Sequence, residues 1–173
     1  MIRYECLEFL APQITDQLVV TSLSGQRIEW AHLSKHEGNL MVGMLGCALG
    51  VGIGLALALP RRRVIVLESD GSVLLSLFNL PTLANLSCPN LAVFVFDNQV
   101  YSGSRISVPT ATAGRTDLEA MARGAGIERA VTVRDLGAFK REASAALSGN
   151  ENRFVVCKVE ESLLHREIPR PTI

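Results

Sequence analysis

The stretch VIVLESDGSVLL, Val64–Leu75, decides the fold predicted for this chain. It opens with a run of branched apolar residues, the composition of a strand that is buried on both faces of a sheet. The run stops at Glu68-Ser69-Asp70-Gly71-Ser72, and an apolar pattern of helical period follows directly. A buried strand that leads at once into a helix is typical of a βαβ unit, and therefore of a parallel sheet.

The rest of the chain repeats this alternation of strand and helix. Strands are predicted at Gln17–Leu23, Arg63–Glu68, Leu91–Phe96, Ala130–Val133 and Phe154–Val159. Helices are predicted at Gly46–Leu59 after the short apolar piece Leu40–Leu45, at Ser72–Leu86 with a break or kink at Pro81, from Asp117 to Gly124 or Gly126, and at Asp135–Leu147.

This alternation predicts a single α/β domain over residues 1–173, built on a doubly wound, mostly parallel sheet with helices on both faces. The core is expected at about residues 17–159, and residues 160–173 form a polar C-terminal tail. The strand order stays open at this point.

The composition agrees with such a sheet and excludes several classes of partner. At 173 residues the chain is long enough for one buried core. Apolar residues make up 48% of it but aromatic residues only 5%, as expected of parallel strands that are covered on both faces. Because the formal net charge is zero, no binding to nucleic acid or to an anionic membrane is expected.

Cysteine usage and hydropathy point to a cytoplasmic protein. The cysteines are scattered, with no CxxC pair, which is typical of reduced and mostly buried thiols; they are Cys6, Cys47, Cys88 and Cys157. The N-terminal MIRYECLEFLAPQ lacks the apolar core of a signal peptide. The longest apolar run, Leu45–Leu59, has 15 residues, below the roughly 20 that a membrane-spanning helix needs.

Two of the predicted strands end in polar residues that could form one site. Ligands bind beyond the carboxyl ends of strands in an open α/β sheet, so Asp70 and Asn98 would emerge side by side if their strands are neighbours. A carboxylate and an amide oxygen are ligands that Mg²⁺ or Ca²⁺ accepts. Gly71 allows close backbone approach, and Ser72 opens a helix whose unpaired N–H groups favour a phosphate. These residues predict a diphosphate site with a divalent ion; the alternative is a helix cap at Asp70 and an ordinary turn around Asn98.

The spacing of these two motifs resembles the signature of thiamine-diphosphate-dependent enzymes. The motif DGS at 70–72 looks like the Gly-Asp-Gly motif of that family, and DN at 97–98 looks like its Asn-Asn motif. Asp97 follows Ser72 by 25 positions. The resemblance extends over about residues 17–159 and is closest to the β subunits of sulfopyruvate decarboxylase and to the C-terminal domain of phosphonopyruvate decarboxylase. The stretches that carry it are GMLGCALGVGIGLALAL, RRRVIVLESDGSVLLSLFNLPTLANLSCPNLAVFVFDNQVY and DLEAMARGAGI.

The resemblance implies a role for each matching residue. Asp70 and Asn98 would supply side-chain oxygens to Mg²⁺, and Val100 its carbonyl oxygen, with diphosphate oxygens and a water completing an octahedron. The bulky apolar residue that holds the cofactor in its bent shape would be Leu45, with Met44 beside it. The other implied cofactor contacts are Gly43 and Leu45 at the aminopyrimidine ring, Gly71 and Ser72 at the diphosphate, and Ser102, Gly103 and Ser104 at the diphosphate and the substrate entrance. Tyr101 is a further implied cofactor contact.

The chain departs from the family pattern at a few positions. Ser69 stands where the family has its first glycine; its Cβ could crowd the turn and its hydroxyl could form a new hydrogen bond, which would weaken cofactor binding. Asp97 stands where many members have asparagine, a change that the decarboxylases it resembles tolerate. Val100 replaces a glycine, but only its carbonyl group would be used.

The resemblance also implies that part of the active site lies on another chain. Enzymes of this type need a glutamate from a second, pyrimidine-binding domain to activate the cofactor, and this chain has room only for the diphosphate-binding domain. Glu37 is not taken for that glutamate. The glycine stripe of the helix at 46–59 is a candidate subunit contact, with packing inside the domain as the alternative.

Three further residues have a candidate role and a plainer alternative. His36 could assist proton transfer near the substrate, or it is an exposed loop histidine. Arg105 could pair with the anionic end of a 2-oxoacid, or it is a solvated loop arginine. Trp30 is most simply a core or interface aromatic.

We therefore predict the β subunit of a heteromeric, thiamine-diphosphate- and Mg²⁺-dependent 2-oxoacid decarboxylase, with sulfopyruvate or phosphonopyruvate as substrate and an α subunit that carries the pyrimidine-binding domain. One alternative is another enzyme of the family, acetolactate-synthase-like or a 2-oxoacid:ferredoxin oxidoreductase β subunit, although the cysteines are not grouped as cluster ligands. Another is a non-catalytic subunit that retains the fold. The last is an unrelated flavodoxin-like or nucleotide-binding module, which predicts a glycine fingerprint that QLVVTSL lacks.

Overall fold

The structure is a computed structural model that describes residues 1–86, 88–101, 107–162, 164 and 167–169. Its helices are α1 (Arg3–Leu10), α2 (Gly25–Leu33), α3 (Ala48–Ala58), α4 (Asp70–Leu75), α5 (Asn79–Asn85), α6 (Leu118–Gly124) and α7 (Leu136–Ser148), with 3-10 turns η1 (Ala11–Gln13) and η2 (Ala111–Ala113). Its strands are β1 (Leu18–Thr21), β2 (Asn39–Met41), β3 (Val64–Ser69), β4 (Leu91–Asp97), β5 (Val100–Tyr101), β6 (Val108–Pro109), β7 (Ala130–Val133) and β8 (Arg153–Lys158). Within the described part of the chain, no helix is long and apolar enough to cross a membrane.

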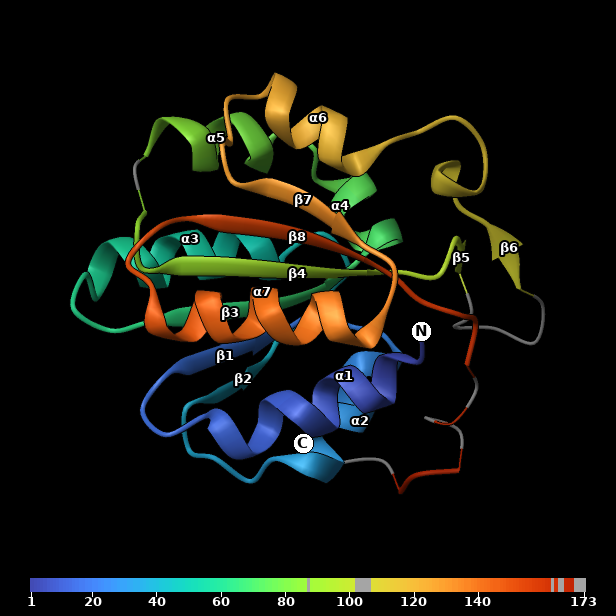
Figure 1. Cartoon of the computed structure of the whole chain (residues 1–173), viewed down its shortest axis with the longest axis horizontal. Helices are drawn as coiled ribbons and strands as arrows, with labels where there is room; N and C mark the ends of the chain where they lie inside the picture. The colour runs from blue at the N-terminus through green and yellow to red at the C-terminus, as the bar shows by residue number, and fades with distance from the viewer. Residues whose placement is uncertain (87, 102–106, 163, 165–166, 170–173) are drawn as a thin grey trace.

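The sheet confirms the predicted fold class. Six strands form one sheet in the order β2-β1-β3-β4-β8-β7, and every neighbouring pair is parallel. Figure 1 shows α5 and α6 on one side of this sheet and α1, α2 and α7 on the other. Strands β5 and β6 form a separate, short antiparallel pair. The chain is therefore an α/β domain whose sheet is covered by helices on both faces.

The apolar run at the start of β3 joins the two helical layers. Val64 and Val66 belong to the buried cluster that includes residues of α3, α5 and α6, whereas Ile65 and Leu67 belong to the cluster with residues of α1 and α7. All four side chains are fully buried. Each such burial contributes about 1.5–3 kcal/mol, so a strand without polar residues is what a doubly covered sheet requires.

The two strands that carry the predicted site are neighbours. β3 pairs with β4 in a register that sets Ser69 beside Phe96. Asp70 and Asp97 therefore leave adjacent strands at the same edge of the sheet. The predicted site depended on this adjacency, which is confirmed.

The helix predicted at residues 72–86 is divided in two. Helix α4 ends at Leu75 and α5 begins at Asn79, so the predicted position of the break, at Pro81, was wrong. Pro81 instead lies in the first turn of α5, where a backbone N–H has no intrahelical acceptor to lose. The turn between the two helices leaves Phe78 70% exposed.

The N-terminal residues add to the core, although the sequence pattern does not predict α1 or α2. Helix α1 buries Cys6, Leu7 and Leu10 against the sheet, so the core begins before residue 17. Arg3 of α1 forms a buried, bidentate ion pair with Glu29 of α2, with N–O distances of 2.8 and 2.7 Å. Such short helices have too few turns for a reliable apolar period.

Candidate functional site

Asp70 lies at the carboxyl end of β3, and it is 1% exposed. Its Oδ2 atom accepts hydrogen bonds from the hydroxyl groups of Thr110 (2.6 Å) and Thr112 (3.0 Å). Its Oδ1 atom is buried and has no hydrogen-bond partner among the described residues. An unsatisfied buried acceptor costs roughly 1–3 kcal/mol, so this oxygen would gain from a partner such as a bound cation or an ordered water.

A second buried carboxylate, Asp97, lies close to Asp70. The hydroxyl oxygen of Thr112 lies between them, 3.0 Å from Asp70 Oδ2 and 2.8 Å from Asp97 Oδ1. Lys158 of β8, which is the sheet partner of Asp97, forms an ion pair with Asp97 Oδ2. Among the described residues, Asp97 therefore has a lysine as its counter-charge, whereas Asp70 takes part in no ion pair.

The pKa of Asp70 is raised, which agrees with the lack of a counter-charge among the described residues. Burial raises the pKa of the Asp70 carboxyl, and the negative charge of Asp97 adds to the increase, against the hydrogen bonds from Thr110 and Thr112. A divalent cation would supply both the missing charge and a partner for Asp70 Oδ1. Within the described ranges, no group of three or more His, Cys, Asp or Glu side chains could hold a metal ion. Oxygen atoms are the ligands that Mg²⁺ prefers, so the Asp70 carboxylate with an amide or a carbonyl oxygen beside it fits the chemistry of a Mg²⁺ site.

The loop after β4 is held in one conformation. Asn98 Oδ1 accepts the N–H of Val100 at 3.2 Å, and Gln99 has a φ of 65°, which is uncommon for a residue other than glycine. The carbonyl of Gln99 accepts the N–H of Thr110 at 2.9 Å, and Val100 pairs with Pro109 in the small sheet. A backbone conformation of this kind persists only where its surroundings hold it, as they often do at functional sites. The predicted ligands Asn98 and Val100 thus lie in the turn that directly follows the buried Asp97.

Gly71 is needed because an aromatic ring lies against it. A Cβ atom at this position would be 2.2 Å from Cε1 of Tyr101. Any side chain here would displace that ring, so the close approach explains the glycine without reference to a ligand. The structure brings together Gly71 and Tyr101, which the sequence predicts as parts of one site.

Ser72 connects the start of α4 to the loop before α3. Its hydroxyl oxygen accepts the N–H of Gly46 at 2.8 Å. This contact holds the segment of Gly43, Met44 and Leu45 beside the DGS motif, with Met44 67% and Leu45 37% exposed. Two large apolar side chains that face outward are available to contact a ligand or a partner.

The hydroxyl of Ser69 forms the additional hydrogen bond that its sequence position suggests. Its Oγ atom accepts the N–H of Ser72 at 3.3 Å and caps α4. This N–H is one of the unpaired donors that a phosphate at the start of the helix would use. Ser69 and a bound diphosphate would therefore compete for the same donor.

Glu68 is a buried residue of this region that the sequence pattern gives no reason to select. Its Oε1 atom accepts the N–H of Leu49 at 3.0 Å, at the start of α3. Burial raises the pKa of the Glu68 carboxyl, against hydrogen bonds from Ser72, Ser22 and the backbone. Glu68 thus joins the end of β3 to the starts of α3 and α4.

Other predicted site residues are placed differently or lie outside the description. The Nε2 atom of His36 is 2.8 Å from the carbonyl oxygen of Thr15, and its Nδ1 atom accepts the N–H of Gly38 at 3.0 Å. Both ring nitrogens are engaged, which favours the structural alternative for His36. The predicted contacts Ser102, Gly103, Ser104 and Arg105 lie outside the described residues.

The chain matches a known family over most of its length. Residues 25–159 match the family described as "Thiamine pyrophosphate enzyme, C-terminal TPP binding domain". The sulfopyruvate decarboxylase subunit beta of Methanocaldococcus jannaschii is 31% identical over 157 residues, which cover 88% of this chain and 82% of that protein. The phosphonopyruvate decarboxylase of Streptomyces viridochromogenes is 33% identical over 128 residues, which cover 72% of this chain and 31% of that protein.

A solved structure shows the same fold. Benzoylformate decarboxylase from Polynucleobacter necessarius superposes with a TM-score of 0.75 at 19% sequence identity. The superposition covers 93% of this chain and 34% of that protein. The chain therefore spans about a third of that enzyme.

Proposed function

The chain belongs to the thiamine pyrophosphate enzymes as a C-terminal TPP-binding domain, and from this premise we propose that it is the diphosphate-binding β subunit of a heteromeric, Mg²⁺-dependent 2-oxoacid decarboxylase. Two relatives support this activity: one is named sulfopyruvate decarboxylase subunit beta, and the other is named phosphonopyruvate decarboxylase. The proposed substrate is accordingly sulfopyruvate, phosphonopyruvate or a similar 2-oxoacid with an anionic end. Thiamine diphosphate, when bound, supplies the electron sink that a 2-oxoacid needs to lose CO₂.

The observation that carries this proposal is the Oδ1 atom of Asp70, which has no hydrogen-bond partner among the described residues. It is buried, it belongs to a carboxyl group whose pKa is raised, and Lys158 is paired with Asp97. Asp70 would bind Mg²⁺ through this oxygen, together with the side chain of Asn98 and the carbonyl of Val100. Asp97 would stay paired with Lys158 and would not need to bind the metal.

The remaining cofactor contacts are proposed for residues that already surround the carboxylates. Gly71 and Ser72, at the start of α4, would contact the diphosphate, with Tyr101 at its border. The exposed side chains of Met44 and Leu45 would support the rings of the cofactor, because the Ser72–Gly46 hydrogen bond holds their loop next to α4. A site with apolar walls and a few convergent polar groups is typical of cofactor binding.

The proposal also requires a partner chain. The chain matches a C-terminal domain only, and its methanogen relative is named as a subunit beta. In the phosphonopyruvate decarboxylase the matching part is 31% of a longer chain. We therefore propose that an α subunit with a pyrimidine-binding domain supplies the activating glutamate and part of the substrate pocket.

The purified chain, supplied with thiamine diphosphate and Mg²⁺, is expected to release no CO₂ from sulfopyruvate or phosphonopyruvate. Activity is expected on mixing with a partner that carries the pyrimidine-binding domain, because the activating carboxylate would come from that partner. A coupled assay of CO₂ release measures both reactions, with the mixture that contains Asp70→Ala as the inactive control. Rapid release by the chain alone would contradict the two-chain proposal, and a mixture inactive on both acids would contradict the substrate class.

Ser69→Gly is expected to tighten Mg²⁺-dependent thiamine diphosphate binding by about 2- to 10-fold, the value of one neutral hydrogen bond. The substitution frees the N–H of Ser72 for the diphosphate, while glycine costs the helix cap only a few tenths of a kcal/mol. Isothermal titration calorimetry measures the affinity. Ser69→Ala is the matched variant, because it also removes the hydroxyl but keeps the Cβ atom. If neither variant binds the cofactor more tightly, Ser69 does not compete with the diphosphate.

A further inference from the structure

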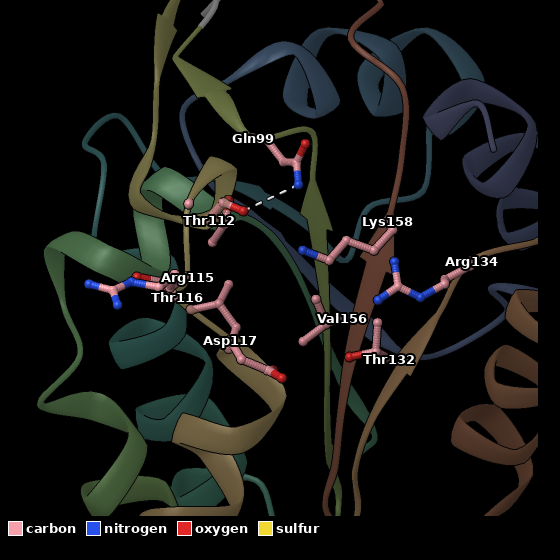
Figure 2. A pocket seen from close by; sticks show the side chains of 11 residues that line it. Gln99, Thr112, Arg115, Thr116, Asp117, Thr132, Arg134, Val156 and Lys158 are labelled. Carbon is pink, nitrogen blue, oxygen red and sulfur yellow. Dashed lines mark hydrogen bonds between the residues drawn. The ribbon is translucent and has the colours of Figure 1, made fainter.

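A polar pocket lies along the same edge of the sheet as Asp70, at the ends of β7 and β8. It has a volume of about 320 Å³ and opens where β7 and β8 end and α6 begins (Figure 2). Gln99, Thr132, Arg134 and Lys158 contribute to its walls. The volume is at the lower end of the range of small-molecule sites.

The pocket exists because α6 covers only part of the sheet beneath it. Val156 of β8 is buried in the cluster that includes Leu118 and Ala122 of α6. Thr132 is the sheet partner of Val156, and alternation along the strands puts Arg134 and Lys158 on this same face. Since α6 begins at Leu118, the strand ends beyond Val156 stay uncovered.

The side chains at these strand ends include two cations, of which Lys158 is paired with the buried Asp97. Figure 2 shows the Arg134 guanidinium beside the Lys158 side chain, whereas the Arg115 guanidinium points away from the strands. Lys158 is paired with Asp97, but Arg134 takes part in none of the ion pairs found among the described residues. On the opposite wall, the carboxylate of Asp117 accepts the N–H of Ala120 at 3.1 Å. Arg134 is exposed, and its guanidinium is available to an anion.

We propose that this pocket binds a small oxyanion, the phosphate, sulfonate or carboxylate head of a metabolite, between Arg134 and Lys158. The planar guanidinium of Arg134 offers two parallel N–H donors to such a group, and the Lys158 ammonium adds a point charge. The hydroxyl of Thr132 can supply a further donor. Thr112 and Gln99 line the pocket next to the carboxylates, but the proposed metal ligands Asp70, Asn98 and Val100 do not, so the oxyanion needs neither Mg²⁺ nor thiamine diphosphate to bind.

Inorganic phosphate tests the site on the full chain, in the absence of Mg²⁺ and thiamine diphosphate. Saturable binding is expected by calorimetry, with NMR amide shifts confined to Thr132–Arg134 and the facing segment Thr116–Asp117. Arg134→Gln is expected to weaken phosphate binding at least about tenfold, because it removes a hydrogen bond between two charged groups. Arg61→Gln is the matched control: it removes the same charge at an exposed position before β3, at the opposite edge of the sheet, and leaves the affinity within about twofold because distant charges are screened.

Asp70→Ala separates this site from the proposed metal site, and phosphate affinity is expected to survive it. The absence of saturable binding by the wild-type chain would overturn the proposal. Equal losses in Arg134→Gln and Arg61→Gln, or binding that requires both Mg²⁺ and Asp70, would overturn it too. Lys158 is not the residue to substitute, because its loss also removes the counter-charge of Asp97.

Discussion

Asp70→Ala is expected to abolish the Mg²⁺-dependent binding of thiamine diphosphate to this chain. Loss of an outer partner of a metal ligand already weakens metal binding by about 10- to 100-fold, so loss of the ligand itself is expected to weaken it by at least about 100-fold. Calorimetry with Mg²⁺ and the cofactor measures the effect. Asp16→Asn is the control, because Asp16 is an exposed aspartate before β1, at the opposite edge of the sheet. An unchanged affinity in Asp70→Ala would exclude Asp70 as a metal ligand.

The fold is expected to survive the loss of this carboxylate, and Asp70→Asn tests that expectation. Because burial raises the pKa of Asp70, the contribution of this one group to the stability of the metal-free chain is fully present below the ordinary carboxyl pKa and is lost as the pH rises through its folded-state pKa. Asp70→Asn has no such charge to bury. In EDTA at neutral pH it is expected to unfold at a temperature equal to or above that of the wild type, with the difference shrinking as the pH falls. Thermal unfolding followed by circular dichroism measures this, and a clearly lower melting temperature at neutral pH would contradict it.

Lys158→Met is expected to destabilise the chain by about 3 kcal/mol, because it leaves Asp97 ionised and buried without a counter-charge. For a domain of this size the loss corresponds to a fall in Tm of roughly 6–12 °C. The side chain of Asp97 is fully buried and that of Lys158 is 24% exposed, which places the expected loss at the lower end for buried pairs. Denaturant unfolding measures the free energy directly.

The double variant Asp97→Asn with Lys158→Met is expected to recover most of that stability. An asparagine at position 97 can still accept the Thr112 hydrogen bond and needs no counter-charge. Lys35→Met, at an exposed lysine after α2, is the control and is expected to change the stability by less than about 0.5 kcal/mol. A double variant as unstable as Lys158→Met would mean that packing by the lysine stem, not charge, holds the end of β8.

The central strands, and the edge of the sheet that carries the candidate site, could be predicted from the sequence. The side-chain contacts of Asp70 and Asp97 at that edge could not. An apolar run such as Val64–Leu67 is explained only by a strand covered on both faces, and parallel strands bring their carboxyl ends to one edge. Asp70, however, is hydrogen-bonded to residues 40 and 42 positions away, and Lys158 reaches Asp97 across 61 positions. No local pattern reports pairings over such separations. Lys158 is at least visible as a charge at the end of the apolar strand FVVCKV.

Local patterns were therefore sufficient for the fold class, for the two strands at the centre of the sheet and for the DGS and DN motifs, because burial and period act between near neighbours in the chain. The fate of each charge came from three-dimensional packing alone. Asp97 is neutralised by a lysine from β8, while Asp70, a similar carboxylate, keeps one oxygen without a partner among the described residues. Interactions between buried charges depend on the distance between them in space and on the exclusion of water. Neither can be predicted from the sequence of residues alone.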